Sequence, residues 1–140
     1  MAPLLLSIGV MTWRRSRNDE RGFTLVELMV VVAVIGVLAT IAIPLFVNVQ
    51  ARGRIAKAQA DSRSLASAVG VYGAHMGGIP TALSQLTAVA TNAQGNRAGP
   101  FMNSVPTPPG GWAAYSYTAN VSAGTYTITS SGDGTSVIYP

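Results

Sequence analysis

Glu27 is the side chain whose setting points most clearly to a functional interaction. It is the only residue with a formal charge in the 25-residue run from Phe23 to Val47. A charge at the centre of a membrane segment costs about 2.5–3.5 kcal/mol, which a leucine would avoid. We therefore interpret Glu27 as a carboxylate retained for a cationic partner. The alternative is a carboxylate that reaches the lipid headgroups or interacts with the dipole of a first helical turn.

Residue types that support catalysis are few. The sequence contains no cysteine and a single histidine, His75. It therefore offers no thiol nucleophile, and no partner pattern around His75 indicates a catalytic triad or a zinc site. His75 lies among glycines where we expect a helix to end, and we interpret it as a loop histidine. These residues predict a protein that is not an enzyme.

A set of aromatic side chains follows a proline-rich stretch. Aromatic side chains can stack on carbohydrates or nucleic-acid bases, but alternation along predicted strands favours packing in a core. Trp112 stands at the start of a strand and could stay exposed. The set comprises Trp112, Tyr115, Tyr117 and Tyr126.

The run that contains Glu27 predicts a membrane-spanning helix over residues 23–47. At about 1.5 Å per residue it would extend about 37 Å, more than the roughly 30 Å of a hydrocarbon core. Pro44 lies inside this run. Because Pro44 lacks an amide proton but is flanked by helix formers, we expect it to kink the helix rather than end it.

Beyond residue 47 the pattern becomes that of an amphipathic helix. Apolar or small residues recur at spacings of three and four, which predicts a stripe lying on a small domain. We expect residues 48–73 to continue the membrane helix, with an exit at Gly73. The stripe comprises Ile55, Ala58, Ser62, Leu65, Val69 and Tyr72.

Residues 74–140 predict a small globular domain with an antiparallel sheet. The segment 81–89 predicts a short helix capped by Thr81, with Leu83, Leu86 and Val89 pointing inward. A polar loop and an irregular proline-rich stretch follow, at 91–99 and 100–111. Strands are expected at 112–118, 125–130 and 135–139, with turns at 120–124 and 132–134. The predicted fold class is α+β, with the long helix packed on this sheet.

The N-terminal motif resembles that of a known family. Gly22-Phe23-Thr24-Leu25-Val26-Glu27, with a basic stretch before it and an apolar helix after it, is similar to the signature of type IV pilins and type II secretion pseudopilins. The resemblance implies that a membrane-embedded prepilin peptidase cleaves between Gly22 and Phe23. It further implies N-methylation of the new N-terminal Phe23, removal of residues 1–22 as a leader, and a pilin-like fold.

The resemblance implies a structural subunit of a bacterial filament that polymerises through its N-terminal helix, either a type II secretion pseudopilin or a simple major type IV pilin. Its partners would be further copies of itself, the prepilin peptidase, an inner-membrane assembly platform with ATPase-driven machinery, and minor pilins or pseudopilins. Before assembly it would contact membrane lipid. In the filament, Glu27 would pair with the Phe23 amine of an adjacent subunit and set the axial register. Pro44 belongs to the same assembly segment.

The formal net charge of +4 does not indicate nucleic-acid binding. Four of the nine basic residues precede Phe23 and would leave with the leader, so that five basic and three acidic residues remain. Charges after the membrane helix fall off its apolar stripe and predict a solvated face or contacts to neighbouring subunits. They are Arg52, Arg54, Lys57, Asp61 and Arg63.

The orientation in the membrane is not decided by charge. Four arginines precede the helix and four basic residues follow it closely, so the positive-inside rule is tied. The peptidase of the resembled family acts on the cytoplasmic side. This implies a single-pass protein of the bacterial inner membrane with a cytoplasmic N-terminus and an external C-terminus, and later a periplasmic or extracellular filament.

Major pseudopilins of the resembled family bind calcium through several acidic side chains of a C-terminal loop. Here Asp133 is the only acidic residue after Asp61. Calcium takes roughly six to eight oxygen ligands, and one carboxylate makes a poor site. We therefore predict no cofactor, keep Asp133 as a weak calcium candidate, and interpret Gly132-Asp133-Gly134 as a turn.

Two alternatives to the main functional interpretation stay open. One is a minor pilin with an adhesive or DNA-binding role. The other is a monomeric single-pass membrane protein with a ligand-binding outer domain, which would leave Glu27 and the Gly22-Phe23 motif unexplained. The residues do not separate a pseudopilus from a pilus.

The apolar residues 1–11 precede the basic stretch, the reverse of the order in a secretory signal peptide. Because leaders of the resembled family are short and hydrophilic, we predict that translation starts at Met11 rather than Met1. Mass spectrometry of the unprocessed protein should find no peptide that contains Leu4 to Ile8. Detection of that peptide would establish the longer leader.

Overall fold

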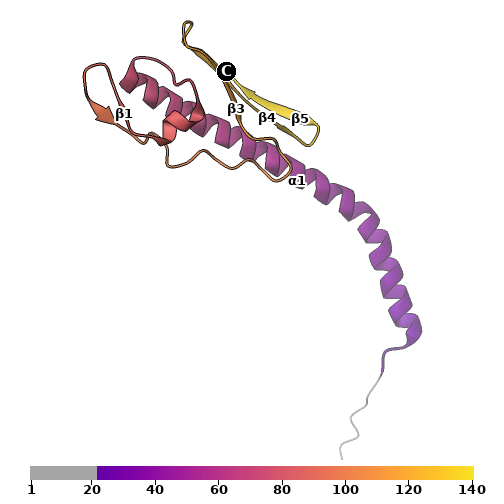
Figure 1. The fold of residues 1–140 in the computed structure, drawn as a ribbon. Coiled ribbons are helices and arrows are strands. Elements are labelled where there is room, and N and C mark those ends of the chain that lie inside the picture. Colours follow the sequence, from indigo (N-terminus) through magenta and orange to yellow (C-terminus); the bar gives the residue numbers. More distant parts are fainter. Residues whose placement is uncertain (1–21) are drawn as a thin grey trace, which may run out of the picture. The chain divides into compact units, whose positions relative to one another are not determined.

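A computed structural model describes residues 22–140 (Figure 1). The predictions for the leader before Gly22 lie outside the described residues. The chain divides into two units, Met1–Ala39 and Thr40–Pro140.

The described part of the first unit is the start of helix α1 (Leu25–Met76) and the three residues before it. Gly22, Phe23 and Thr24 are outside the helix and exposed. From Leu25 the sequence is an almost continuous run of apolar residues that form helices in an apolar medium, where the backbone groups must satisfy one another. The predicted membrane helix therefore begins within two residues of its expected start.

In the second unit α1 runs through Pro44, as expected, and ends at Met76, three residues beyond the Gly73 that we expected. Gly77 ends it: its amide donates to the Gly73 carbonyl at 2.8 Å and its φ is +77°. Glycine adopts this left-handed conformation without a steric cost. The loop interpretation of His75 is consequently wrong, because His75 lies in the last turn of the helix.

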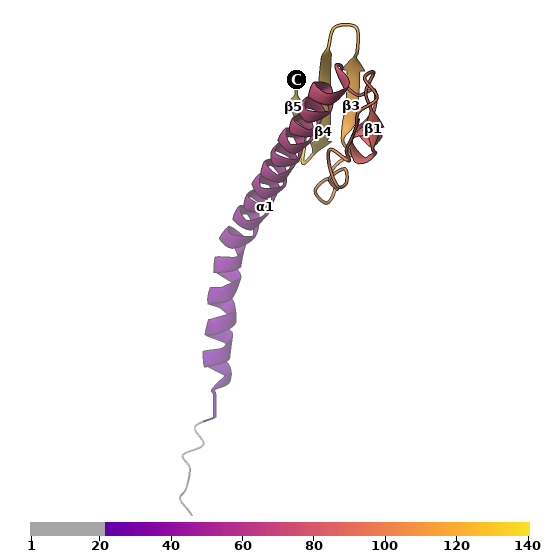
Figure 2. The same ribbon diagram turned by 90° about the vertical axis from the view of Figure 1, so that its left-hand side faces the viewer.

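The main sheet is a three-stranded antiparallel meander, β3 (Ser116–Asn120), β4 (Thr125–Gly132) and β5 (Thr135–Tyr139), in the order β3-β4-β5. Ser116 pairs with Thr129, and Gly132 pairs with Thr135 across the second turn. The first strand begins four residues later than predicted and the third has the predicted bounds. Figures 1 and 2 both show this sheet alongside the C-terminal part of α1.

The core forms between the sheet and the amphipathic stripe of α1. Leu65 and Val69 of the helix pack in one cluster with Ile128 of β4 and Tyr115, all of them buried. The α+β architecture, with one long helix against a small antiparallel sheet, is thus confirmed. Five of the six stripe residues are buried and Ile55 is partly buried: Ala58, Ser62, Leu65, Val69 and Tyr72 form the buried set.

The segment between helix and sheet differs in two places from the prediction. The expected helix is a short 3₁₀ helix, η1 (Leu83–Thr87), without a side-chain cap; Thr81 instead donates its amide to the Gln85 side chain at 2.8 Å. Leu86 is buried, but Val89 is exposed because the extended Ala88 directs the chain out of the helix.

The expected polar loop contains a two-residue ribbon, β1 (Ala90–Thr91) with β2 (Arg97–Ala98). The Asn92 side chain organises it by accepting hydrogen bonds from the amides of Gln94 and Asn96. Residues 100–111 contain no helix or strand, as predicted.

Trp112 closes one end of the core and is 7% exposed, so the expectation that it could stay exposed is wrong. Its indole lies on the backbone of Gly132, where an added Cβ would overlap the ring. Trp112 forms a second small cluster with Ala58 of α1 and Val137 of β5. Gly132 is therefore required by close approach rather than by its φ angle.

Substitution Gly132→Ala should lower the free energy of unfolding by about 1–3 kcal/mol, the usual cost of overpacking a core. Thermal unfolding of the full chain in detergent, followed by tryptophan fluorescence, measures this change. Gly110→Ala is the matched control, because an added Cβ there meets no atom. Equal stability of the two variants would contradict the assigned packing.

Candidate functional site

An apolar helix surface without a cover is the dominant feature of the described N-terminal residues. All large apolar side chains from Phe23 to Val49 are at least 48% exposed. Among the described residues, α1 is the one helix that is long and apolar enough to cross a membrane. Exposure of this much apolar surface to water is strongly unfavourable, so lipid or other protein chains must cover it.

A capping box forms the start of this helix and engages Glu27. The Thr24 amide donates to Glu27 Oε2 at 2.9 Å, and the Thr24 hydroxyl donates to the same oxygen at 2.7 Å. In return the Glu27 amide donates to Thr24 Oγ1 at 3.2 Å. Reciprocal bonds of this kind satisfy amides that a helix start otherwise leaves unpaired.

The capping box engages only one of the two carboxylate oxygens of Glu27. Both bonds from Thr24 converge on Oε2, and neither of them engages Oε1. Thr24, whose side chain binds this carboxylate, directly follows Gly22 and Phe23 in the sequence. The structure thereby brings together three of the predicted site residues, Gly22, Phe23 and Glu27, whereas Pro44 lies in the second unit.

Thr24 is a residue that the sequence argument missed. The signal was present, because a threonine followed three residues later by glutamate at the head of an apolar run is a capping-box pattern. The alternative of a carboxylate at the first helical turn is the local geometry that the structure contains.

The Gly22–Phe23 bond is the predicted processing site. Both residues precede the helix and are exposed, and the Phe23 side chain is 86% exposed. A peptidase needs an accessible, non-helical peptide bond, and this bond has both properties. Cleavage itself stays a prediction.

In the second unit, Arg54 and Asp133 form an ion pair that the sequence did not predict. Arg54 Nε and Nη2 donate to the two carboxylate oxygens of Asp133 at 2.7 and 2.6 Å. Trp112 Nε1 donates to Oδ2 of the same carboxylate at 2.8 Å. The hydrogen bonds from Arg54 and then Trp112 lower the pKa of Asp133 to about 2. The interpretation of Asp133 as a turn residue alone was incomplete.

A second polar group joins Lys57, Asp61 and Tyr115. Lys57 Nζ donates to Asp61 Oδ2 and to the Thr107 carbonyl, both at 2.6 Å, and the Tyr115 hydroxyl donates to Asp61 Oδ2 at 2.7 Å. Burial, followed by the hydrogen bond to Asp61, raises the pKa of Tyr115.

The prediction of a solvated face is therefore wrong for Arg54 and Asp61, which are partly buried. Lys57 stays exposed, in agreement with the prediction, although it donates to Asp61 and to the Thr107 carbonyl. Exposed ion pairs stabilise little when isolated, but here each one is joined to a buried aromatic side chain. Arg52 and Arg63 are exposed, in agreement with the prediction.

The residues around Asp133 do not fit a calcium site. Both carboxylate oxygens are engaged by the Arg54 guanidinium, and Trp112 adds a third donor. No group of three acidic or histidine residues that could hold a metal ion exists within residues 22–140. A calcium ion would have to displace a cation that is covalently part of the chain.

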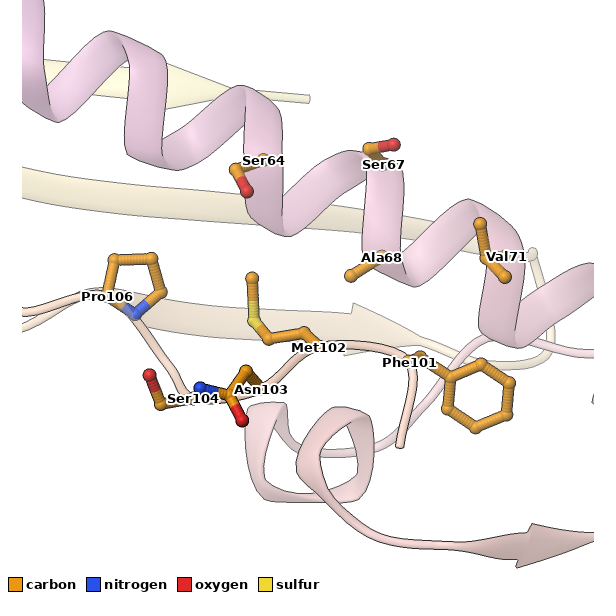
Figure 3. A pocket seen from close by; sticks show the side chains of 9 residues that line it. All are labelled: Ser64, Ser67, Ala68, Val71, Phe101, Met102, Asn103, Ser104 and Pro106. Carbon is orange, nitrogen blue, oxygen red and sulfur yellow. The ribbon is translucent and has the colours of Figure 1, made fainter. Parts of the chain in front are cut away.

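A groove of about 420 Å³ lies between α1 and residues 101–106 (Figure 3). Met102 points from the loop toward the helix in this view, next to Ala68. Its lining contains no titratable side chain, so it provides no acid or base for catalysis. The lining residues are Ser64, Ser67, Ala68, Val71, Phe101, Met102, Asn103, Ser104 and Pro106.

Comparison with known protein families finds two matches that together cover most of the described chain. Residues 17–43 match the prokaryotic N-terminal methylation motif. Residues 46–136 match the family of type II secretion system protein G.

Individual relatives agree with these matches. The chain is 50% identical over 54 residues to the type IV major pilin protein PilA of Myxococcus xanthus, which is 39% of this chain and 24% of the relative. It is 47% identical over 62 residues to the fimbrial protein EcpB of Eikenella corrodens, 44% of this chain and 38% of the relative. It is 30% identical over 80 residues to the type II secretion system core protein G of Pseudomonas aeruginosa, 57% of this chain and 56% of the relative. The chain thus matches 24–56% of the length of these relatives. No solved structure matches it.

Substitution Thr24→Val removes the hydroxyl of the capping box and should loosen the first helical turn. Loss of an N-cap costs about 1 kcal/mol, which predicts roughly fivefold faster hydrogen–deuterium exchange of the amides at the helix start, measured on the full chain in detergent micelles. Thr24→Ser retains the hydroxyl and should exchange like the wild type. Unchanged exchange in Thr24→Val would show that the cap does not hold this turn.

Proposed function

This chain belongs to the type II secretion protein G family, since residues 46–136 match its family model, and we propose that it is a structural subunit of a type IV pilus-like filament. Within that class we assign it to the pseudopilins of type II secretion. The observation that carries the proposal is the uncovered apolar surface of α1 with a single carboxylate near its start.

The physical argument begins with what can cover that surface. In the membrane, lipid covers it; outside the membrane, only apolar surfaces of other protein chains can. Burial of one large apolar side chain contributes about 1.5–3 kcal/mol, so helices gathered from many copies associate strongly. An isolated single-pass protein would need only the lipid contact, and Glu27 would serve it only through the capping box with Thr24.

Glu27 supplies what an apolar surface lacks, a defined position along the neighbouring helix. After cleavage the Phe23 amine is a cation, and the Glu27 Oε1 of an adjacent copy is a suitable acceptor. Burial of a carboxylate next to an ammonium costs much less free energy than burial of either charge alone. The Thr24 hydroxyl and amide would orient the carboxylate for this pairing.

Processing follows from the same stretch. The exposed, non-helical Gly22–Phe23 bond supports cleavage by a prepilin peptidase, and the match to the methylation motif supports N-methylation of Phe23. We propose an inner-membrane precursor with its N-terminus in the cytoplasm, which an ATPase-driven assembly platform then draws into a periplasmic filament. Minor pseudopilins would be further partners.

The choice of a pseudopilin over a pilin depends on the globular part. The family matched by residues 46–136 is that of type II secretion protein G. The protein G relative also matches a larger share of this chain, 57%, than the pilin relative at 39%. A simple major type IV pilin is the second candidate, favoured by the higher identity of that pilin over its shorter match. Filaments of this protein that can be sheared from the cell surface would indicate a pilin. A secretion defect in a strain that lacks the protein, without such filaments in the wild type, would indicate a pseudopilin.

Substitution Glu27→Gln or Glu27→Leu should leave membrane insertion intact and reduce incorporation into filaments by tenfold or more, because one unpaired partner of a buried ion pair costs about 3–5 kcal/mol. Quantitative immunoblotting of membrane and sheared filament fractions measures both quantities.

Val26→Leu is the matched control, since it changes an exposed neighbour without altering charge. Mass spectrometry of the same fractions should find mature chains that begin with methylated Phe23. Normal filament incorporation of both Glu27 variants would refute the register mechanism, and an unprocessed N-terminus in filaments would refute the proposed assembly route.

A further inference from the structure

We propose that Arg54 acts as a built-in structural cation for the 132–134 turn. Its guanidinium holds this turn against α1 in place of a divalent metal ion. The resembled family places calcium in its C-terminal loop, and the residues of this chain do not fit that ion. The inference concerns the isolated subunit and does not depend on the proposed filament role.

The turn brings its carboxylate to a defined position. Asp133 and Gly134 both have positive φ angles, +53° and +72°, as in the tight two-residue turns that connect antiparallel strands. Asparagine and aspartate tolerate this left-handed conformation better than other residues with a side chain. Asp133 therefore serves the turn and at the same time presents an anion to α1.

Arg54 lies 79 residues away in the sequence and approaches that anion side-on. Two N–H groups meet the two carboxylate oxygens at 2.7 and 2.6 Å, the bidentate geometry in which guanidinium and carboxylate match. An arginine guanidinium is always charged, and the pairing further raises the pKa of Arg54 and lowers that of Asp133. Lysine could provide the charge but not the rigid, planar pair of donors that matches the two carboxylate oxygens.

The indole of Trp112 completes the arrangement. Its Nε1 donates to Oδ2 of Asp133 at 2.8 Å, and its ring covers the backbone of Gly132. The segment just after Trp112 is tied to the same strand, since the Ala113 amide donates to the Ser131 carbonyl at 2.8 Å. One carboxylate thus connects the helix, the segment before β3 and the β4–β5 turn, which is the structural work that a bound metal ion performs in a loop.

The donor set argues directly against replacement by a metal. A calcium site collects about six to eight oxygens with compensating negative charge. Asp133 offers one carboxylate that is already neutralised. The other acidic side chain in residues 40–140 is Asp61, which is held by Lys57 and Tyr115.

The test uses the full chain in detergent micelles. Thermal unfolding of the wild type should have the same midpoint in millimolar calcium chloride and in EDTA. Terbium ions should give no Asp133-dependent luminescence on tryptophan excitation, although Trp112 would sensitise any ion bound at that carboxylate. Arg54→Gln should lower the midpoint by about 4 °C or more, and Arg54→Lys should fall between this variant and the wild type.

Arg52→Gln is the matched control, an exposed arginine on the same helix with no ion pair among the described residues. It should unfold like the wild type. The proposal is overturned if calcium raises the wild-type midpoint, if terbium luminescence appears and is lost in Asp133→Asn, or if Arg54→Gln and Arg52→Gln unfold alike. The calcium and EDTA comparison needs no variant to fold, because it is made on the wild type alone.

Discussion

A long, exposed apolar helix surface is the constraint on which the rest of this structure depends. The second half of α1 has an apolar stripe that the sheet covers, but the large side chains from Phe23 to Val49 are exposed. Water is an unfavourable environment for that surface. This apolar surface is therefore stable only in a lipid bilayer or in contact with other apolar helices. That requirement agrees with the match to the methylation motif and to the type II secretion protein G family.

A charged group in such an apolar segment needs hydrogen-bond donors in place of the water that it loses. The amide and the hydroxyl of Thr24 both donate to one oxygen of the Glu27 carboxylate, and the Glu27 amide donates back to the Thr24 hydroxyl oxygen. This arrangement lowers the cost of a charge in the apolar run, because part of its hydration is replaced by fixed donors. Because both donors of Thr24 go to Oε2, the capping box does not use Oε1, which is the oxygen that the proposed intermolecular contact requires.

The globular part is small, contains no cysteine and has a modest core, so its stability requires contacts besides apolar packing. Two carboxylates compensate by connecting distant segments. Asp133 joins Arg54 to Trp112, and Asp61 joins Lys57 to Tyr115. In both groups a basic residue of α1 and an aromatic residue near the sheet share one acid, so the helix carries both the apolar and the ionic contacts of the domain.

The sequence by itself determined the long helix, its apolar and amphipathic halves, the strand at 135–139 and the motif around Gly22, Phe23 and Glu27. Local periodicity and short motifs carry that information, because neighbours in sequence are neighbours in these elements. Even the missed cap at Thr24 was a local signal. Only the tertiary structure decided that Arg54 meets Asp133. That pair spans 79 residues, and such contacts depend on how the sheet packs on the helix, which no local pattern encodes.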